Sequence, residues 1–505
     1  MRPTTITIRL FSALAATLAA LPAQAADISS AVGPVGTASW AASCPGPQSA
    51  PGGTSQLPAC PGGGSTCLHR VVIDPLEFPD ATCSDGTPGV FYVRPGSGGD
   101  EDRWVIHLQG GGACRDYDEC LERWCGQQSI YSANKMSSDW NADGTTDLAR
   151  HVHGPGMASA SATNEFSTWT HVWAYYCSSD SWQGTESDVE FTDGVDTFYL
   201  DAQGHNVLRA MRNMLRKRNS DPLWTAADGY SVGDLDDATE IVFTGTSAGA
   251  QGAVANADWF LAPFPAADRS LVVDANFDLD DWLTLVEDFR VDYDLDGVGD
   301  DWWSDEMMAI VNDQWASGGY LDRIGGVHDE TCMDLYYASG RMDRCEFMPV
   351  LFTLNSGNAG LIETPTFVRL DLADNVLSDV YTQHPNKFGT SVVIGPGFAA
   401  PTTTISDFIR VARATLIGVF DDHDSVTGLF APRCGAHVGL EDGPAFGLHT
   451  TPDTDEAFSP PMEIAGTDMT FHDALWEWLN VGGGGTRVDL RRVDTDEPGV
   501  AFSGC

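Results

Sequence analysis

The chain carries very little basic charge. Only three of its 505 residues are lysine (Lys135, Lys217 and Lys387), and 27 Lys and Arg residues stand against 72 Asp and Glu, for a formal net charge of -45. Phosphate backbones and anionic lipid headgroups repel such a polyanion, so we expect neither nucleic acid nor an anionic membrane surface as a partner. A disordered chain is excluded as well, because the 15 Trp, 23 Phe and 12 Tyr need a core to bury them.

Long apolar runs are also missing. No segment has eighteen unbroken apolar residues, so the sequence predicts no transmembrane helix. At the start of the chain, Arg2 and Arg9 lead into an apolar stretch over residues 10–21, and Ala23-Gln24-Ala25 then gives the small-x-small pattern of a signal peptidase site. We expect residues 1–25 to be a signal peptide and the product to be secreted or periplasmic. The expected mature chain then has a net charge of -47, from 25 basic and 72 acidic residues.

Cys-x-x-Cys pairs are absent, which argues against a zinc site. All 12 cysteines follow residue 25, and an even number of cysteines in an exported protein predicts disulfides. Their pairing does not follow from the spacing. The cysteines are Cys44, Cys60, Cys67, Cys83, Cys114, Cys120, Cys125, Cys177, Cys332, Cys345, Cys434 and Cys505.

Composition divides the expected mature chain into two parts. Residues 26–69 are rich in Gly, Pro and Ser and predict an N-terminal arm without regular core elements. In residues 70–505, short apolar runs alternate with segments of helical period and no linker interrupts them, so we expect one domain. This alternation predicts an α/β fold with a mostly parallel sheet covered by helices on both faces. The predicted strands are 91–93, 104–108, 171–175, 240–243, 270–273 and 366–370, and the clearest helices are 206–216 and 405–419.

A Gly-x-Ser-x-Gly motif, residues 245–249, joins a predicted strand to a helical segment. The tight turn leaves no room for side chains on either side of the serine, and it exposes the hydroxyl of Ser247 at a helix N-terminus. The helix dipole and the amide of Ala248 favour the negative charge that develops in acyl transfer. The motif therefore predicts Ser247 as a nucleophile and Ala248 as an oxyanion donor. A small-residue turn without a catalytic role is the alternative.

A second glycine cluster follows the predicted strand 104–108. Gly110, Gly111 and Gly112 stand where an α/β-hydrolase keeps the other half of its oxyanion hole, so the amides of Gly111 and Gly112 are candidate donors. A phosphate-binding loop is the chemical alternative, but no Lys follows the cluster and GxxxxGK[ST] is absent. A flexible turn is the simpler alternative.

Several motifs, in this order, resemble those of the pectin acetylesterase/Notum family of serine carboxylester hydrolases. Residues 83–89 (CSDGTPG) are similar to the family's Cys-x-Asp-Gly-Ser/Thr-Pro opening, and residues 108–114 (LQGGGAC) to its Leu-Glu-Gly-Gly-Gly-Trp-Cys block. Residues 176–184 (YCSSDSWQG) are the most specific part of the match. The resemblance spans roughly residues 70–440 and implies an α/β-hydrolase-like fold and carboxylesterase activity.

The same resemblance implies the rest of a catalytic triad. Residues 433–437 (RCGAH) are similar to the family's segment around the catalytic histidine, which gives His437. Residues 364–374 are similar to the strand that delivers the acid, which gives Asp374, with Asp371 as a rival. The chain order Ser247, Asp374, His437 is the order that the α/β-hydrolase fold requires. Among the other histidines, His423 and His449 are the nearest competitors of His437 for this role.

Two details accompany this assignment. Ala113 stands where many relatives carry Trp, so we expect a different wall of the acyl pocket. Cys434 is close to His437, so we expect a disulfide to hold the histidine loop.

Two acidic loops repeat the DxDxDG spacing of calcium sites, in which alternating carboxylates converge on a hard cation. Trp303 and Arg150 occupy the twelfth positions, so neither loop is a full EF-hand, and a solvated acidic loop is the alternative. We expect any calcium to be structural, and no cofactor for catalysis. The predicted ligands are Asp292, Asp294, Asp296 and Asp300 in one loop, and Asp139, Asn141, Asp143 and Asp147 in the other.

The sequence thus favours an exported serine carboxylesterase that removes acyl groups, with acetyl the first expectation, from a glycan or a related small ester. A lipase-like or polyester-cleaving hydrolase with a longer acyl preference is the first alternative. A non-catalytic, calcium-dependent glycan-binding protein is the second. The charge of -47 would repel unmethylated polygalacturonate, so neutral acetylated glycans or a calcium-bridged polyanion fit the electrostatics better. The oligomeric state does not follow from the sequence.

Overall fold

The computed structural model describes most of the predicted catalytic domain. It covers residues 68–125, 136–138, 156–216, 232–277, 319–337, 345, 348–352, 361–374, 376–377, 405–422, 426–441, 464, 467, 469–480 and 487–494. The predicted signal peptide and nearly all of the predicted N-terminal arm lie outside these residues. The boundaries proposed for those two segments therefore stay predictions.

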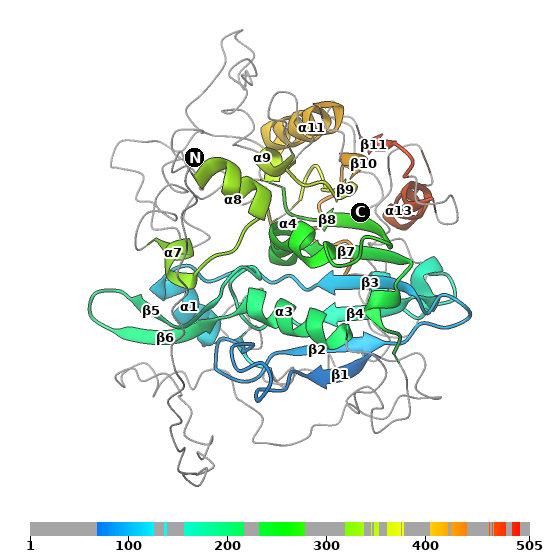
Figure 1. Cartoon of the computed structure of the whole chain (residues 1–505). Helices are drawn as coiled ribbons and strands as arrows, with labels where there is room; N and C mark the ends of the chain where they lie inside the picture. Colours follow the sequence, from blue (N-terminus) through cyan, green and yellow to red (C-terminus); the bar gives the residue numbers. More distant parts are fainter. Residues whose placement is uncertain are drawn as a thin grey trace, which may run out of the picture.

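A mostly parallel sheet forms the centre of the described chain (Figure 1). Its nine strands run in the order β1-β2-β4-β3-β7-β8-β9-β10-β11, and the pairs from β4 onward in this order are parallel, while β2 pairs antiparallel with both β1 and β4. The strands are β1 (His69–Val72), β2 (Val90–Arg94), β3 (Arg103–Leu108), β4 (Thr170–Ala174), β7 (Glu240–Thr246), β8 (Asp268–Asp274), β9 (Thr366–Arg369), β10 (Val426–Ala431) and β11 (Leu490–Val493).

Strands β2, β4, β7 and β9 are buried along their whole length, as continuous apolar runs in a covered parallel sheet require. All six predicted strands are present, and the predicted helices correspond to α3 (Gly204–Leu215) and α11 (Ile405–Asp422). The prediction of a mostly parallel α/β fold is confirmed.

Hydrophobic side chains fill both faces of the sheet. Alternate residues of one strand enter different clusters: Ile241 and Phe243 belong to the larger cluster with residues of α3, α4 (Ala248–Leu261) and α11, whereas Val242 belongs to a second cluster. That second cluster contains Trp478 and Leu475 of α13 (Phe471–Leu479). The period of two along a strand thus produces two helix-covered layers.

A separate hairpin extends beside the main sheet. Strands β5 (Glu186–Thr192) and β6 (Thr197–Ala202) pair antiparallel, next to α1 (Tyr117–Trp124) and α7 (Tyr320–Ile324) (Figure 1). Phe191 and Phe198 stack at 5.8 Å between ring centroids and share a third hydrophobic cluster with Tyr117. The remaining described elements are α8 (Glu330–Tyr337), α9 (Met348–Phe352), and the short 3-10 turns Gly156–Ala158, Glu165–Thr168 and Leu235–Asp237.

Disulfides join the described segments, as the cysteine content predicts. The bonds are Cys83–Cys177, Cys114–Cys120 and Cys332–Cys345. Cys434 is disulfide-bonded as well, which confirms the expectation for the histidine loop, and so is Cys125. No helix in these described ranges combines the length and apolarity that a bilayer crossing needs.

Candidate active site

Ser247 lies at a strained turn between β7 and α4. Its backbone angles are φ 55° and ψ −123°, which few residues other than glycine adopt. The flanking glycines are required by close approach: a Cβ on Gly245 would lie 2.1 Å from the carbonyl oxygen of Gly249, and one on Gly249 would lie 2.0 Å from that of Leu108. The turn holds the serine at the carboxyl end of β7, where ligands of open α/β sheets bind.

His437 lies between this serine and a buried carboxylate. Its Nε2 is 2.9 Å from Ser247 Oγ, and its Nδ1 is 2.8 Å and 3.0 Å from the two carboxylate oxygens of Asp374. The Asp374 side chain is fully buried and also accepts hydrogen bonds from the amides of Val376 and Leu377, both at 2.9 Å. The carboxylate is therefore oriented from two sides, and it in turn orients the imidazole.

Asp371 has a different partner. Its carboxylate lies 2.5 Å from Nη2 of Arg369, and both side chains are fully buried. Burial raises the pKa of Asp371 to about 7, against the opposing charge of Arg369. Of the two candidate acids, Asp374 is the one that contacts His437. The rival histidines His423 and His449 lie outside the described residues.

The glycine cluster packs directly against the serine turn. A Cβ on Gly110 would lie 2.3 Å from the carbonyl oxygen of Thr246 and 3.1 Å from Cβ of Ser247. Gly111 and Gly112 have φ values of 141° and 66°, which favour glycine. Throughout the described chain, the amides of Gly111, Gly112 and Ala248 donate to no protein acceptor. Three backbone N–H groups beside Ser247 are thus available to a ligand oxygen.

Two charged side chains hold this glycine loop. Arg123 of α1 is fully buried and donates from Nη2 to the carbonyl of Gly111 at 2.5 Å. Glu441, four residues after His437, accepts from the amide of Gly110 at 2.8 Å and contacts Nε2 of His107 at 3.1 Å. The histidine loop and the glycine loop therefore share a direct contact.

The YCSSDSWQG block, residues 176–184, holds Gln109, the residue that directly precedes the glycine cluster. The Trp182 indole N–H donates to the carbonyl of Gln109 at 3.0 Å, and the Gln109 side chain accepts from the amide of Tyr176 at 3.2 Å. Asp180 is buried and accepts four hydrogen bonds, from the hydroxyl of Ser178 and from the amides of Trp182, Gly184 and Gly204. Burial raises the pKa of Asp180, and these hydrogen bonds oppose that rise.

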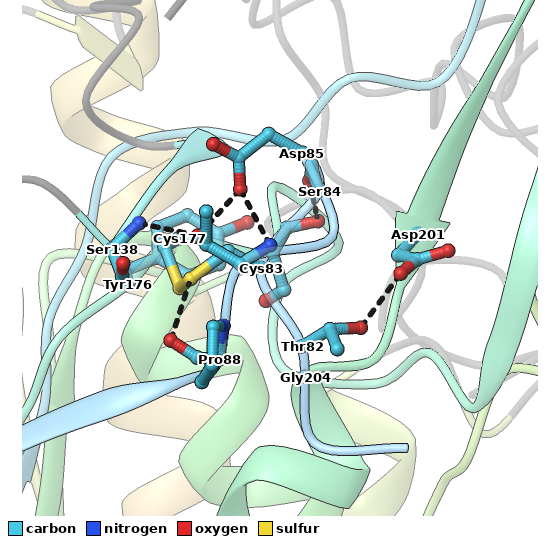
Figure 2. Close-up of a disulfide and its surroundings, with 12 residues drawn as sticks. Thr82, Cys83, Ser84, Asp85, Pro88, Ser138, Tyr176, Cys177, Asp201 and Gly204 are labelled. Atoms are coloured by element: carbon cyan, nitrogen blue, oxygen red, sulfur yellow. Dashed lines mark hydrogen bonds between the residues drawn. A yellow bond between two sulfur atoms is a disulfide. The ribbon is translucent and has the colours of Figure 1, made fainter. Parts of the chain in front are cut away.

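A disulfide ties the CSDGTPG motif to the start of this block (Figure 2). Cys83 bonds Cys177, and the adjacent Ser84 donates from its amide to the carbonyl of Cys177 at 2.9 Å and from its hydroxyl to the carbonyl of Ser178 at 2.8 Å. Asp85 in the same motif accepts from the amide and hydroxyl of Thr87, which closes a tight turn. Two motifs far apart in the sequence thus form one rigid support.

A buried ion pair lies beside the candidate triad of Ser247, His437 and Asp374. Arg369 ends β9, Asp274 ends β8, and Nη1 of the arginine is 2.8 Å from Oδ1 of the aspartate. Burial lowers the pKa of Arg369, but the carboxylates of Asp371, Asp274 and Asp374 outweigh it and raise that pKa above its ordinary value. The sequence predicted no role for Arg369, Asp274, Arg123, Glu441 or Asp180. For Arg369 and Asp274, the sequence shows only a single charged residue at the carboxyl end of an apolar strand.

The predicted calcium loops, residues 292–301 and 139–147, lie outside the described residues, so calcium binding there stays a prediction. Among the residues that the structure does describe, no group of three or more His, Cys, Asp or Glu side chains is arranged to hold a metal ion.

Comparison with known proteins supports the resemblance. Residues 66–282 match the sequence model of the pectinacetylesterase family, a segment that contains Ser247 but ends before Asp374 and His437. The chain is 26% identical over 199 residues to pectin acetylesterase 11 of Arabidopsis thaliana, covering 39% of this chain and 42% of that protein. It is 27% identical over 185 residues to palmitoleoyl-protein carboxylesterase notum1a of Danio rerio, covering 36% and 30%. The match thus spans less than half the length of these relatives.

The fold likeness reaches further along the chain. The solved structure of the Wnt deacylase Notum from Drosophila superposes with a TM-score of 0.53 at 20% sequence identity, over 85% of this chain and 97% of that one. At this identity the likeness establishes the fold alone. Sequence and fold together confirm the resemblance of this chain to the pectin acetylesterase/Notum family, with residues 66–282 carrying the family's sequence model.

Proposed function

We propose that the protein is a serine carboxylester hydrolase that removes acyl groups, acetyl first among them, from a glycan or a related small ester. The observation that carries the proposal is the continuous chain of contacts from Ser247 Oγ through His437 to Asp374, at 2.9 Å and 2.8 Å. Nucleophile, base and orienting acid lie within hydrogen-bond distance in the order that acyl transfer requires.

The contacts support a role for each group. The carboxylate of Asp374 accepts a hydrogen from Nδ1 of His437, which leaves the Nε2 lone pair facing the serine hydroxyl. His437 takes the proton of Ser247 as its oxygen attacks the ester carbonyl, then gives it to the leaving alcohol. Water repeats the cycle on the acyl-enzyme and releases the acid. Asp374 stabilises the imidazolium that forms in each half-reaction.

The amides of Gly111, Gly112 and Ala248 would bind the oxyanion. Two belong to the glycine cluster that packs against the serine turn and the third directly follows Ser247, and none has a protein acceptor in the described chain. Each such donor contributes about 3 kcal/mol to transition-state stabilisation in enzymes where one has been removed. The positive end of α4 adds to the same field.

The net charge of the chain and the names of its relatives favour different substrates. The acidity of the chain disfavours an unmethylated polygalacturonate and favours a neutral acetylated glycan. One relative is named a pectin acetylesterase, and another a palmitoleoyl-protein carboxylesterase, a name that indicates a long acyl chain. We propose the short acyl preference and keep the long one as the alternative. Export is part of the proposal, supported by the disulfides.

Hydrolysis of p-nitrophenyl esters of increasing chain length tests the proposal. We expect the highest kcat/KM on the acetate, and we expect Ser247→Ala to abolish turnover while circular dichroism and the thermal midpoint stay unchanged. A preference for the octanoate would select the long-chain alternative. Turnover that survives Ser247→Ala, or a wild-type chain inert toward every ester, would overturn the proposed chemistry, and the inert chain would favour the glycan-binding alternative.

A further inference from the structure

The Arg369–Asp274 ion pair connects segments that each carry one member of the triad. The two residues are direct partners on the neighbouring parallel strands β8 and β9, and both side chains are fully buried. Strand β8 precedes the triad acid and histidine in the chain by about a hundred residues or more, so only the folded sheet brings them together. Each residue of the pair also makes hydrogen bonds to the segments that carry Ser247 or His437.

On the nucleophile side, Asp274 holds the end of β7. Its Oδ2 accepts from the hydroxyl of Thr246 at 2.7 Å, and its backbone carbonyl accepts from the amide of Ser247 at 2.9 Å. The residue before the nucleophile and the nucleophile's own amide are thus both bound to one aspartate.

On the histidine side, the pair holds the loop on both sides of His437. Arg369 donates to the backbone carbonyls of Ala436 at 3.1 Å and His437 at 3.0 Å. Asp274 Oδ2 accepts from the amides of Gly439 at 3.1 Å and Leu440 at 2.8 Å. These are contacts to the backbone, so they fix where the loop lies whatever its side chains do.

Stability alone does not account for such a pair. Burying two charges costs several kcal/mol per ion, and well-packed apolar residues often replace a buried pair without loss of stability. What apolar residues cannot replace is the set of directed hydrogen bonds to two separate segments. We propose that Arg369 and Asp274 are positioning residues that fix His437 relative to Ser247, an inference that rests on the proposed function.

The double variant Arg369→Met/Asp274→Asn separates positioning from stability. In Asp274→Asn alone, the amide that replaces Oδ1 would face the N–H groups of Arg369. In Arg369→Met alone, the carboxylates of Asp274 and Asp371 are left buried without their cation. Both single variants should lower the thermal midpoint. In the double variant neither conflict between residues 369 and 274 exists. Asp371 also loses Arg369, but it can take up a proton, because burial already raises its pKa to about 7 with Arg369 in place. We therefore expect the midpoint at pH 6 to recover most of the loss.

Activity should not recover with it. A misplacement of about 1 Å at a reacting group can lower the rate about 100-fold, so we expect kcat of the folded double variant on p-nitrophenyl acetate to stay about 100-fold below wild type, with KM within about twofold. A kcat that returns to wild type along with the thermal midpoint would overturn the inference, because the pair would then be only structural.

A matched control lies at the opposite end of the same strand. Arg487 is largely buried and pairs with Asp268, at the start of β8, at 2.8 Å. The double variant Arg487→Met/Asp268→Asn removes the same two charges far from the triad and should leave kcat unchanged. An equal fall of kcat in both double variants would contradict a specific positioning role.

A smaller change keeps the inference testable if the double variant does not fold. Thr246→Val removes the hydroxyl that donates to Asp274 and keeps the shape of the side chain. We expect kcat to fall about tenfold at constant KM, since a hydrogen bond to a charged group is lost. An unchanged kcat in this variant would count against the inference. Ser247→Ala turning over ester would overturn the proposed function itself, whereas an inactive Ser247→Ala beside a fully active Arg369→Met/Asp274→Asn would overturn the inference alone.

Discussion

Asp180→Asn should weaken both the fold and the glycine loop, residues 110–112. Asp180 Oδ1 accepts from the Ser178 hydroxyl at 2.6 Å and the Trp182 amide at 3.0 Å, and Oδ2 accepts from the amides of Gly184 at 3.1 Å and Gly204 at 2.7 Å. Asparagine keeps one acceptor oxygen and places an NH2 group against the other pair of donors. No rotamer of the amide satisfies all four groups.

The orientation of the asparagine amide that costs less free energy determines the size of the loss in stability. If the amide faces Ser178, that hydroxyl can rotate to accept, and only the buried N–H of Trp182 loses its partner, at about 1–3 kcal/mol. The bonds that remain are no longer charge-assisted, and charge-assisted bonds are roughly twice as strong as neutral ones. Removing a buried charge, whose cost is visible in the raised pKa of Asp180, offsets part of this loss. We expect the free energy of unfolding to fall by about 3 kcal/mol.

Activity should fall as well, because Trp182 links this turn to the carbonyl of Gln109, one residue before the glycine cluster. We expect a decrease in kcat of about tenfold for the folded variant at constant KM. Urea unfolding monitored by tryptophan fluorescence gives the stability, and p-nitrophenyl acetate hydrolysis in the absence of urea gives kcat.

Asp193→Asn is the matched control. Asp193 also accepts from two backbone amides, those of Val195 and Asp196, but it lies on the exposed tip of the β5–β6 hairpin. Its substitution should leave both the urea midpoint and kcat unchanged. The reasoning is wrong if Asp180→Asn unfolds at the same urea concentration as Asp193→Asn. The link to the glycine loop is wrong if stability falls and kcat does not.

Two further predictions concern single carboxylates. Asp374→Asn should lower kcat at least about 1,000-fold, since the imidazole of His437 loses its orienting acceptor, whereas Asp371→Asn should keep kcat within about tenfold of wild type; the reverse order would exchange their roles. Burial raises the pKa of Asp329 to about 7, so its stabilising contribution is fully present below about pH 4 and lost as the pH rises through 7. Asp329→Asn, which keeps an acceptor for the amide of Cys332, should therefore gain at most about 4 kcal/mol relative to wild type between about pH 4 and pH 8 in urea unfolding, and a constant difference would refute this.

The central strands could be predicted from the sequence because they are buried on both faces. Residues 241–243 and 271–273 are continuous apolar runs, a pattern that is typical of parallel strands in a covered sheet. The hairpin Glu186–Ala202 escaped prediction for the opposite reason. In β5 only Val189 and Phe191 are buried and Glu190 separates them, so the apolar signal is short.

The turn around Ser247 was also visible in the sequence, because most of its pattern is local. Strand, glycine, serine, glycine and helix follow one another without a gap, and the close approach that requires Gly245 comes from Gly249, four residues later. The approach that requires Gly249 comes from the distant Leu108. The choice between Asp374 and Asp371 was not local. Both are buried after β9, and what separates them is Arg369, which binds Asp371 and leaves Asp374 to His437.

Contacts between distant segments account for what the sequence could not give. Asp274 meets Arg369 through the register of β8 and β9, and Glu441 meets Gly110 across more than three hundred residues. Neither pair has a motif, because the chemistry needs only a charge at the right place in three dimensions. For Asp274 and Arg369, the sequence shows only a single charged residue at the carboxyl end of an apolar strand.

The central claim is that Ser247, activated by His437, is the nucleophile of an ester hydrolase. Reaction with a p-nitrophenyl phosphonate, followed by intact mass and peptide mapping, tests it most directly. We predict one phosphonyl group per chain, on the peptide that contains Ser247, with loss of esterase activity in proportion to labelling and no labelling of Ser247→Ala or His437→Ala. Stoichiometric labelling at another residue, or full esterase activity in the chain labelled at Ser247, would contradict the account.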